Sequence, residues 1–196
     1  MTIPAQRSSH AEPTPRSILW RRIDRPGLEG ACLEFRDGLW NLSGTAVVQE
    51  GSQVCRLEYA VVCDAAWRTL WTRVTGWIGY TPVAIRISAY GTGRWRFNGT
   101  DCPAVAGATD VDLGFTPSTN LLPIRRLSLA VGAAAPVMAA WLQFPDLSLT
   151  ILDQTYERTD ERTYRYQSGG GKFVADLEVD EVGLVRRYGD IWLAGG

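Results

Sequence analysis

Residues 30–64 read GACLEFRDGLWNLSGTAVVQEGSQVCRLEYAVVCD, and apolar side chains recur there at every second position. A period of two is typical of β-strands that are buried on one face. Asp37-Gly38 and Glu50-Gly51-Ser52 interrupt the alternation with residues that favour tight turns. This stretch therefore predicts three antiparallel strands joined by hairpins.

The same alternation continues along most of the chain, and no amphipathic helix of ordinary length is evident. Between residues 110 and 123, one glycine and two prolines instead predict a loop with one short helical turn, begun near Thr116. The pattern predicts a single all-β domain of about a dozen antiparallel strands, with at most one or two short helical turns, at residues 18–196. Residues 1–17 are expected to form a disordered leader. Further strands are predicted at 69–80, 82–90, 94–97, 124–131, 137–144, 147–153, 172–180 and 184–188.

Composition argues against several classes of partner. The chain has 196 residues, with 20 basic against 21 acidic side chains, so no net field of the whole chain attracts nucleic acid or an anionic membrane. No apolar stretch approaches the roughly 20 residues that a membrane-spanning helix needs. Residues 1–17 lack the apolar run of a secretory signal, so a cytoplasmic location is expected. The sequence does not indicate an oligomeric state.

Histidine and cysteine chemistry is largely excluded. The one histidine, His10, falls in the predicted leader, so no Ser-His-Asp or Cys-His catalytic group can be assembled. The four cysteines form no CxxC pair, and Cys32, Cys55 and Cys63 are expected to be buried free thiols. We therefore expect no metal, no cofactor and no catalytic residue of these types.

Residues 110–127 read DVDLGFTPSTNLLPIRRL, and this segment resembles the signature of the putative glycolipid-binding family, long described as a bacterial domain of unknown function. Gly27-Leu28-Glu29-Gly30 and Phe144-Pro145-Asp146-Leu147 agree with the resemblance, which covers roughly residues 18–193. It implies antiparallel strands curled into a roll or half-barrel, similar to the periplasmic carriers of lipoproteins. It also implies a glycolipid ligand.

Residues 69–80 carry one candidate ligand surface. Trp71, Arg73 and Trp77 share a face of the predicted strand. Indole rings can lie against the C–H faces of sugars, and a guanidinium between them can donate to hydroxyl or phosphate oxygens. The alternative is that the indoles pack structurally at the ends of the roll.

A second group of candidates follows from the signature. Asp110 and Asp112 project to the same side of an extended segment and could accept sugar hydroxyls or act as the acid and base of a glycosidase. Alternatively, they pair with Arg125 or Arg126, which would point to opposite faces of a strand, one of them able to hold an anionic headgroup. Asn120 either stabilises its own turn or contacts a sugar. Tyr156, together with Tyr164 and Tyr166, could form a rim.

Three functions remain open. The preferred hypothesis is the binding of an amphipathic small molecule, such as a glycolipid, in the concavity of the sheet. The second is a hydrolase of a glycoside or ester that uses a desolvated carboxyl group at Asp64, Asp110 or Asp112. The third is an interaction module with a filled interior and an exposed apolar patch.

Overall fold

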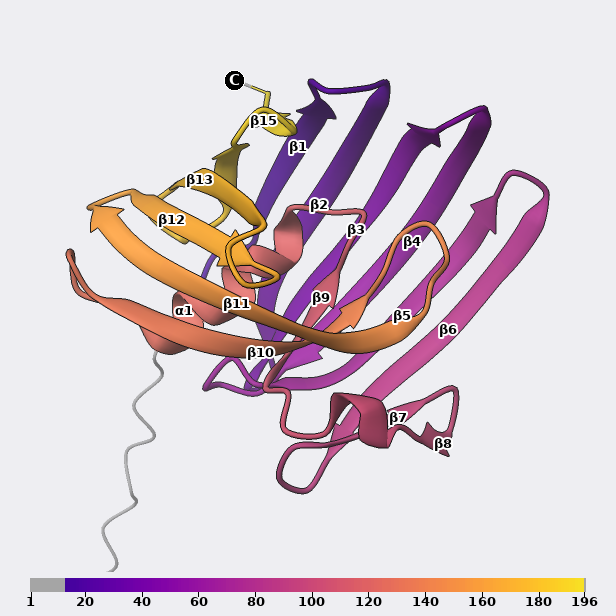
Figure 1. Ribbon diagram of the computed structural model, residues 1–196, viewed down its shortest axis with the longest axis horizontal. Helices are drawn as coiled ribbons and strands as arrows, with labels where there is room; N and C mark the ends of the chain where they lie inside the picture. The colour runs from indigo at the N-terminus through magenta and orange to yellow at the C-terminus, as the bar shows by residue number, and fades with distance from the viewer. Residues whose placement is uncertain (1–12, 196) are drawn as a thin grey trace, which may run out of the picture.

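Residues 13–195 are described by a computed structural model, and they form one curled sheet of fifteen strands (Figure 1). The strands are β1 (Arg16–Arg22), β2 (Gly27–Arg36), β3 (Leu39–Glu50), β4 (Gln53–Cys63), β5 (Thr69–Ile78), β6 (Thr81–Tyr90), β7 (Arg94–Phe97), β8 (Thr100–Asp101), β9 (Asp110–Leu113), β10 (Ala134–Leu142), β11 (Leu149–Asp160), β12 (Thr163–Ser168), β13 (Phe173–Val179), β14 (Val185–Tyr188) and β15 (Trp192–Ala194). Two 3-10 turns, η1 (Pro103–Val105) and η2 (Ser118–Asn120), and one helix, α1 (Leu121–Leu127), complete the described part.

The sheet is a meander in two halves. Strands β1 to β8 pair in chain order, strands β10 to β15 do the same, and an antiparallel pairing of β1 with β15 joins the halves. Strand β9 runs parallel to β10, so β8 and β9 are the free edges. The sheet does not close into a barrel; instead the Val111 amide donates to Thr69 Oγ1 at 3.1 Å, which holds edge strand β9 against β5. The predicted all-β class and half-barrel curl are therefore confirmed.

The three strands predicted from residues 30–64 are confirmed as β2, β3 and β4. Leu33, Leu42 and Val61 stand opposite one another in the register of the three strands, and all three are buried. The two-residue turn at Asp37-Gly38 has positive φ at both residues, as a tight hairpin requires. Alternation and turn chemistry agree here, so the local sequence specifies the register.

The sequence-based assignment was wrong around the signature. Residues 110–113 form strand β9 rather than loop, because their backbone pairs with distant strand β10. Residues 124–131 do not form a strand: α1 extends to Leu127 and ends at Ser128, which has a φ of 45° and donates its amide to the Ile124 carbonyl. Pro123 is tolerated because it lies in the first turn of the helix, where backbone amides have no intrahelical acceptor.

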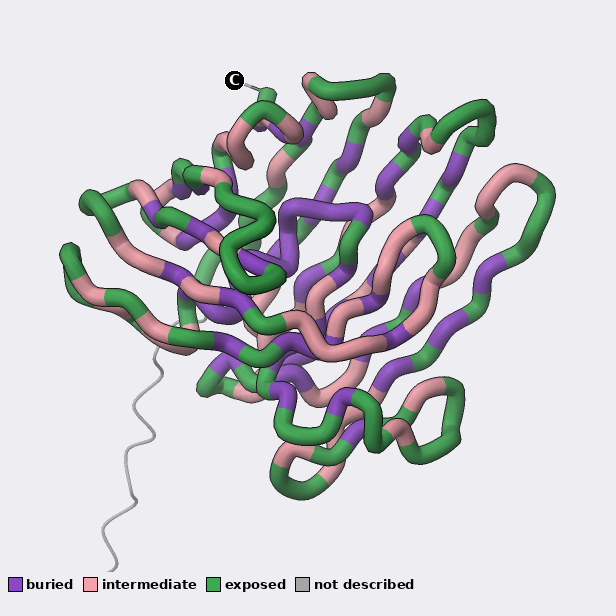
Figure 2. The backbone as a smooth tube through the Cα atoms, in the orientation of Figure 1, coloured by how far each residue is buried: buried purple, intermediate pink, exposed green. Residues whose placement is uncertain are grey.

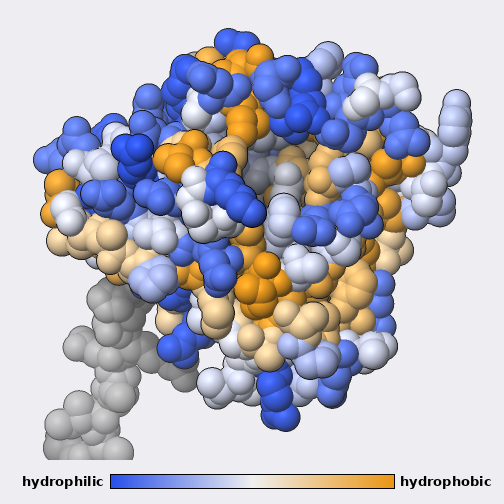
Figure 3. All heavy atoms as spheres, viewed as in Figure 1, coloured by the Kyte–Doolittle hydropathy of each residue, from blue (hydrophilic) through white to orange (hydrophobic). Residues whose placement is uncertain are grey.

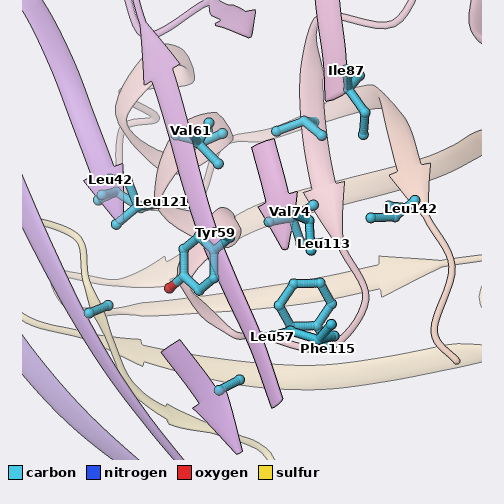
Figure 4. Packing of buried hydrophobic residues seen from close by; sticks show 14 of the residues in the cluster. Leu42, Leu57, Tyr59, Val61, Val74, Ile87, Leu113, Phe115, Leu121 and Leu142 are labelled. Carbon is cyan, nitrogen blue, oxygen red and sulfur yellow. The ribbon is translucent and has the colours of Figure 1, made fainter. Parts of the chain in front are cut away.

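The signature segment, which we define as residues 110–127, fills much of the interior of the roll. Every residue from Phe115 to Ile124 is buried, and Figure 2 shows this run as a continuous purple segment inside the sheet. Phe115 and Leu121 pack among side chains of β3, β4 and β5, as Figure 4 shows. The ring of Phe115 lies 6.0 Å from that of Tyr59. Burying this many apolar side chains contributes about 1.5–3 kcal/mol for each large one.

The structure also tests the predictions about the leader, the cysteines and membrane-spanning helices. Arg16 and Ser17, assigned to the leader, belong to β1, while His10 lies outside the described residues. All four cysteines are free; Cys55 and Cys63 are buried as expected, but Cys32 is exposed. The expectation for Cys32 was wrong because the thiol lies on the outer face of β2. No helix in the described part is both long and apolar enough to cross a membrane.

Candidate functional site: a cleft beside the signature segment

A cleft of about 340 Å³ remains between the signature segment and the C-terminal strands. Figure 3 shows the surface hollowed between the two halves of the sheet. One side of the cleft is polar and is formed by Asp112, Thr116 and Asn120 of the signature. The other side is mainly aromatic and is contributed by strands β10 and β12 to β15, with the side chains of Trp141, Tyr166, Phe173, Tyr188 and Trp192.

Asp112 provides the carboxyl group of the cleft. Its Oδ2 accepts a hydrogen bond of 2.6 Å from Gln154 Nε2, and its Oδ1 lies 3.4 Å from the Thr119 hydroxyl. Desolvation by burial raises the pKa of Asp112 to about 6, although the hydrogen bonds from Gln154 and Thr119 act in the opposite direction. The group therefore changes charge within the physiological range.

The aromatic side is held by ring-to-ring contacts. The centroids of Tyr166, Phe173 and Tyr188 lie 5.9 to 6.1 Å apart, in edge-to-face contacts with interplanar angles of 64° to 84°. Burial raises the pKa of both Tyr166 and Tyr188 above the ordinary tyrosine value, so both hydroxyls stay protonated. The Tyr166 oxygen accepts from Gln154 Nε2 at 3.1 Å, which leaves its proton available to donate.

Arg22 and Trp192 border the cleft where β1 meets β15. The guanidinium carbon of Arg22 lies 5.0 Å from the centroid of the Trp192 ring, in a cation–π contact. Asp24 fixes the guanidinium through two hydrogen bonds of 2.7 and 2.8 Å. The cleft is thereby lined by an oriented cation and an indole face as well as by a carboxyl group.

Glu29 lies behind the floor of the cleft. Its Oε1 accepts hydrogen bonds of 2.5 Å from both the Tyr59 and the Thr116 hydroxyls, while Oε2 is buried without a partner. Desolvation raises the pKa of Glu29 to about 7 despite the hydrogen bonds from Thr116 and Tyr59. This carboxyl joins β2 and β4 to the signature segment, and Thr116 connects it to the cleft.

Only some of the candidate residues in the signature segment line the cleft. Asp112 and Asn120 line the cleft. Asp110 instead forms an ion pair of 2.6 Å with Arg126, which is the structural alternative considered for these residues. Arg125 projects elsewhere on α1, with its guanidinium 5.4 Å from the Trp67 ring. The expectation that the two arginines point to opposite faces of a strand was wrong, because they lie on a helix, where successive side chains diverge by about 100°.

Tyr156 lies beneath the cleft rather than at a rim. It is 1% exposed, and its hydroxyl donates to Asn120 Oδ1 at 2.8 Å. Tyr164 and Tyr166 are buried as well. Tyr156 therefore orients Asn120, whose Nδ2 donates to the Pro117 carbonyl at 3.0 Å.

Trp71, Arg73 and Trp77 lie on the outer face of β5, away from the cleft. The inner face of this strand is formed by Thr72 and Val74, which are buried, and the two sets alternate as strand geometry requires. These three residues and the cleft therefore belong to different surfaces.

Sequence reasoning named Tyr166 as a candidate, and Tyr166 lines the cleft, but it missed Glu29, Gln154, Arg22 and the other aromatic residues of the cleft. Of these residues, only Glu29 could have been found from the sequence. It is an acidic residue on the same predicted strand face as the apolar Ala31 and Leu33, which indicates a buried carboxyl group. The aromatic residues come from strands that meet only through the β1–β15 pairing. Within residues 13–195, no group of His, Cys, Asp and Glu side chains is arranged to hold a metal ion.

The described residues thus form an open β-roll, antiparallel except for the β9–β10 pair, with a small cleft of mixed polarity. The chain belongs to the family described as "Putative glycolipid-binding", whose model matches residues 17–194. Among solved structures, a DUF1089 family protein from Pseudomonas aeruginosa is 26% identical over 96% of each chain, with a TM-score of 0.70. A beta-barrel-like protein of the domain of unknown function DUF1849 from Brucella abortus is 10% identical over 92% of this chain and 94% of its own, with a TM-score of 0.52, and shows the fold alone. No curated protein matches the sequence.

Proposed function

We propose that the cleft binds the sugar headgroup of an amphipathic molecule of the glycolipid class. The observation that carries this proposal is the convergence of Asp112 and an aromatic side on one space of about 340 Å³. Sugars combine hydroxyl groups, which need hydrogen-bond partners, with flat C–H faces, which pack on aromatic rings. The family description supports the same class of ligand.

The size of the cleft limits what it can hold. Small-molecule sites span roughly 300–1,000 Å³, so this cleft lies at the lower end of that range. The buried residues Phe115 to Ile124 fill much of the concavity beside the cleft. The chain of the ligand would therefore leave past Phe173, which lines the cleft and is 37% exposed.

Each side of the cleft has a distinct role in this proposal. Ionised Asp112 accepts hydrogen bonds from sugar hydroxyls, and the protonated Tyr166 hydroxyl donates to a ring or hydroxyl oxygen. Phe173, which is 37% exposed, provides an apolar face, and Arg22, which also lines the cleft, donates to oxygens at the edge of the sugar.

Calorimetric titration with an alkyl glucoside, kept below its critical micelle concentration, tests the proposal. A Leu152→Trp variant fills the cleft from β11, because Leu152 lines it. Val174→Trp is the matched control, since Val174 lies on β13, is 45% exposed and does not line the cleft. We expect the wild type and Val174→Trp to show heat of binding, and Leu152→Trp to show none. Equal binding by Leu152→Trp would contradict the proposal.

A carboxylate-dependent hydrolase is the second candidate, favoured by the raised pKa of Asp112, which is a property of a general acid. The other two carboxyl groups considered are engaged elsewhere: Asp110 with Arg126, and Asp64 with the backbone amides of Ala66 and Arg68. Hydrolysis of chromogenic glycosides and esters, compared between wild type and Asp112→Asn, tests this candidate. Turnover that is unchanged in the variant would exclude Asp112 as the acid.

A further inference from the structure

The N-terminal half of the sheet has an outer face turned away from α1 (Figure 1). Large apolar side chains on this face are exposed. Leu19 and Leu28 are each 56% exposed, Val54 is 49% exposed and Val47 is 43% exposed. Trp77 adds an indole that is 36% exposed. These five residues, which we call the outer-face patch, come from five neighbouring strands and so form one surface rather than scattered single exposures.

Strand register joins the patch into a row. Leu28 stands opposite Val47, Val47 opposite Arg56, and Arg56 opposite Trp77. Cross-strand neighbours on one face lie about 5 Å apart, so these four side chains are in contact range along the row. The fully exposed Tyr80 follows Trp77 in the β5–β6 turn.

Two arginines stand beside this row without an acidic partner. Arg73 of β5 lies directly opposite Arg86 of β6. Among residues 13–195, neither guanidinium takes part in a salt bridge or a side-chain hydrogen bond. Like charges directly opposite each other destabilise a sheet, so the fold gains nothing from this pair. The nearby acidic residue Glu58 is already paired with Arg56.

A shallow groove of about 460 Å³ runs from β1 across the same face to Arg73. The groove is lined in part by small residues, among them Gly30, Ser43 and Ala60. The outer face therefore combines apolar side chains, an indole, unpaired guanidinium groups and a shallow groove beside them.

We propose that this outer face docks on the surface of an anionic lipid bilayer. Aliphatic side chains and indoles favour the boundary between acyl chains and headgroups, and guanidinium groups beside them attract acidic headgroups. The Arg73–Arg86 pair gives the charge complementarity, because a lipid phosphate between two guanidinium groups removes their repulsion. The five exposed apolar side chains would be buried in the bilayer interface, and this burial adds a hydrophobic contribution to the electrostatic attraction.

The row also ends beside the cleft. Arg21 stands opposite Leu28 on the outer face of β1, and the next residue, Arg22, lines the cleft on the inner face. A bilayer held against the outer face would therefore lie near the strand that borders the cleft. The docking surface does not depend on what the cleft binds, because the two sites share no residue.

Co-sedimentation of the full chain with vesicles tests docking. The probes are vesicles of phosphatidylcholine alone and vesicles in which about one third of the lipid is phosphatidylglycerol. We expect binding to the anionic vesicles that weakens as salt increases, and little binding to the neutral ones. The double variant Arg73→Gln, Arg86→Gln should weaken binding about thirtyfold, and Val47→Thr, which keeps the side-chain shape, should weaken it further.

Matched controls separate docking from general charge and hydropathy. Arg162→Gln with Arg165→Gln removes two exposed charges from the other half of the sheet, and Val174→Thr matches Val47→Thr. Asp112→Asn tests independence from the cleft. Full vesicle binding by these three controls would support the proposal. Absent sedimentation, equal loss in the controls, or a concentration-dependent dimer that the patch variants abolish would overturn it.

Discussion

Gln154 Nε2 donates to Asp112 Oδ2 at 2.6 Å, and this bond fixes the one carboxyl group that lines the described cleft. The same nitrogen donates to the Tyr166 hydroxyl at 3.1 Å. A single amide thereby orients an acceptor and a donor from opposite sides of the cleft. Strand β9 supplies Asp112, whereas β11 and β12 supply Gln154 and Tyr166, so the arrangement depends on the pairing of the C-terminal strands.

Binding of the sugar should become stronger as pH rises through about 6. Hydroxyl donors stabilise the ionised form of Asp112, whose pKa in the unbound protein is about 6, so binding favours loss of the proton. Titration of an alkyl glucoside between pH 5 and 8 measures this dependence. The Asp112→Asn variant should bind about tenfold more weakly at the upper end and show no such dependence. A pH profile shared by wild type and variant would refute the role of Asp112.

Glu29 should make folding stability fall as pH rises. The pKa of Glu29 is about 7 in the folded chain against 4.5 for an unperturbed group. The folded state therefore binds the proton of Glu29 more tightly than the unfolded state does. The resulting contribution to the free energy of unfolding is on the order of 3 kcal/mol. It is fully present below pH 4.5 and is lost as pH rises through 7. Urea unfolding at several pH values measures this loss. Glu29→Gln keeps the hydrogen bonds to Oε1 and should be the more stable protein at pH 8; equal slopes for both proteins would contradict the assignment.

Removal of Arg126 should destabilise the fold through Asp110. The Asp110 side chain is 1% exposed, and Arg126 is its ion-pair partner at 2.6 Å. Arg126→Met leaves a buried carboxylate without compensation, at a cost of about 3 kcal/mol in the free energy of unfolding. The double variant with Asp110→Asn should recover much of this loss, as chemical denaturation can measure. A double variant no more stable than Arg126→Met would show that the ion pair is not the cause.

Gly44 should not tolerate a methyl group. A Cβ built there lies 2.5 Å from the Tyr59 hydroxyl oxygen and 2.8 Å from the Gly30 carbonyl oxygen. We expect Gly44→Ala to cost about 2 kcal/mol, because it displaces the tyrosine that donates to Glu29. Gly30→Ala is the matched control on the neighbouring strand, where the nearest atom is Leu19 Cδ1 at 4.0 Å. Thermal melting would refute the steric explanation if both substitutions lowered stability equally.

Local alternation was sufficient to predict strands β2 to β7, but not β1 or β8. In β2 to β4, the buried residues recur every second position and each turn has residues of the required conformation. The same reasoning failed at residues 124–131, where Leu127, Leu129 and Val131 also alternate. There the helix forms because Leu121, Leu122 and Ile124 are buried inside the roll, and that burial depends on strands far away in sequence.

The candidate site was predictable only in part. Asp112 and Asn120 belong to a segment that resembles a family signature, so the sequence drew attention to them. Of the aromatic side, only Tyr166 was a candidate. Phe173 and Tyr188 could not be predicted to join it, because they meet Tyr166 through the pairings of β12, β13 and β14. The mixed face of β5 was recognised, but no local pattern distinguishes the inner from the outer face of a strand that has apolar residues on both.

Native mass spectrometry of the full chain, purified from its own host, tests the headgroup cleft most directly. We expect an adduct with the mass of a glycolipid that is retained by the wild type and by Val174→Trp and lost from Leu152→Trp, whose introduced indole fills the cleft. A wild-type protein that carries no adduct, or an adduct that Leu152→Trp retains in full, would contradict the assignment of the cleft as the binding site.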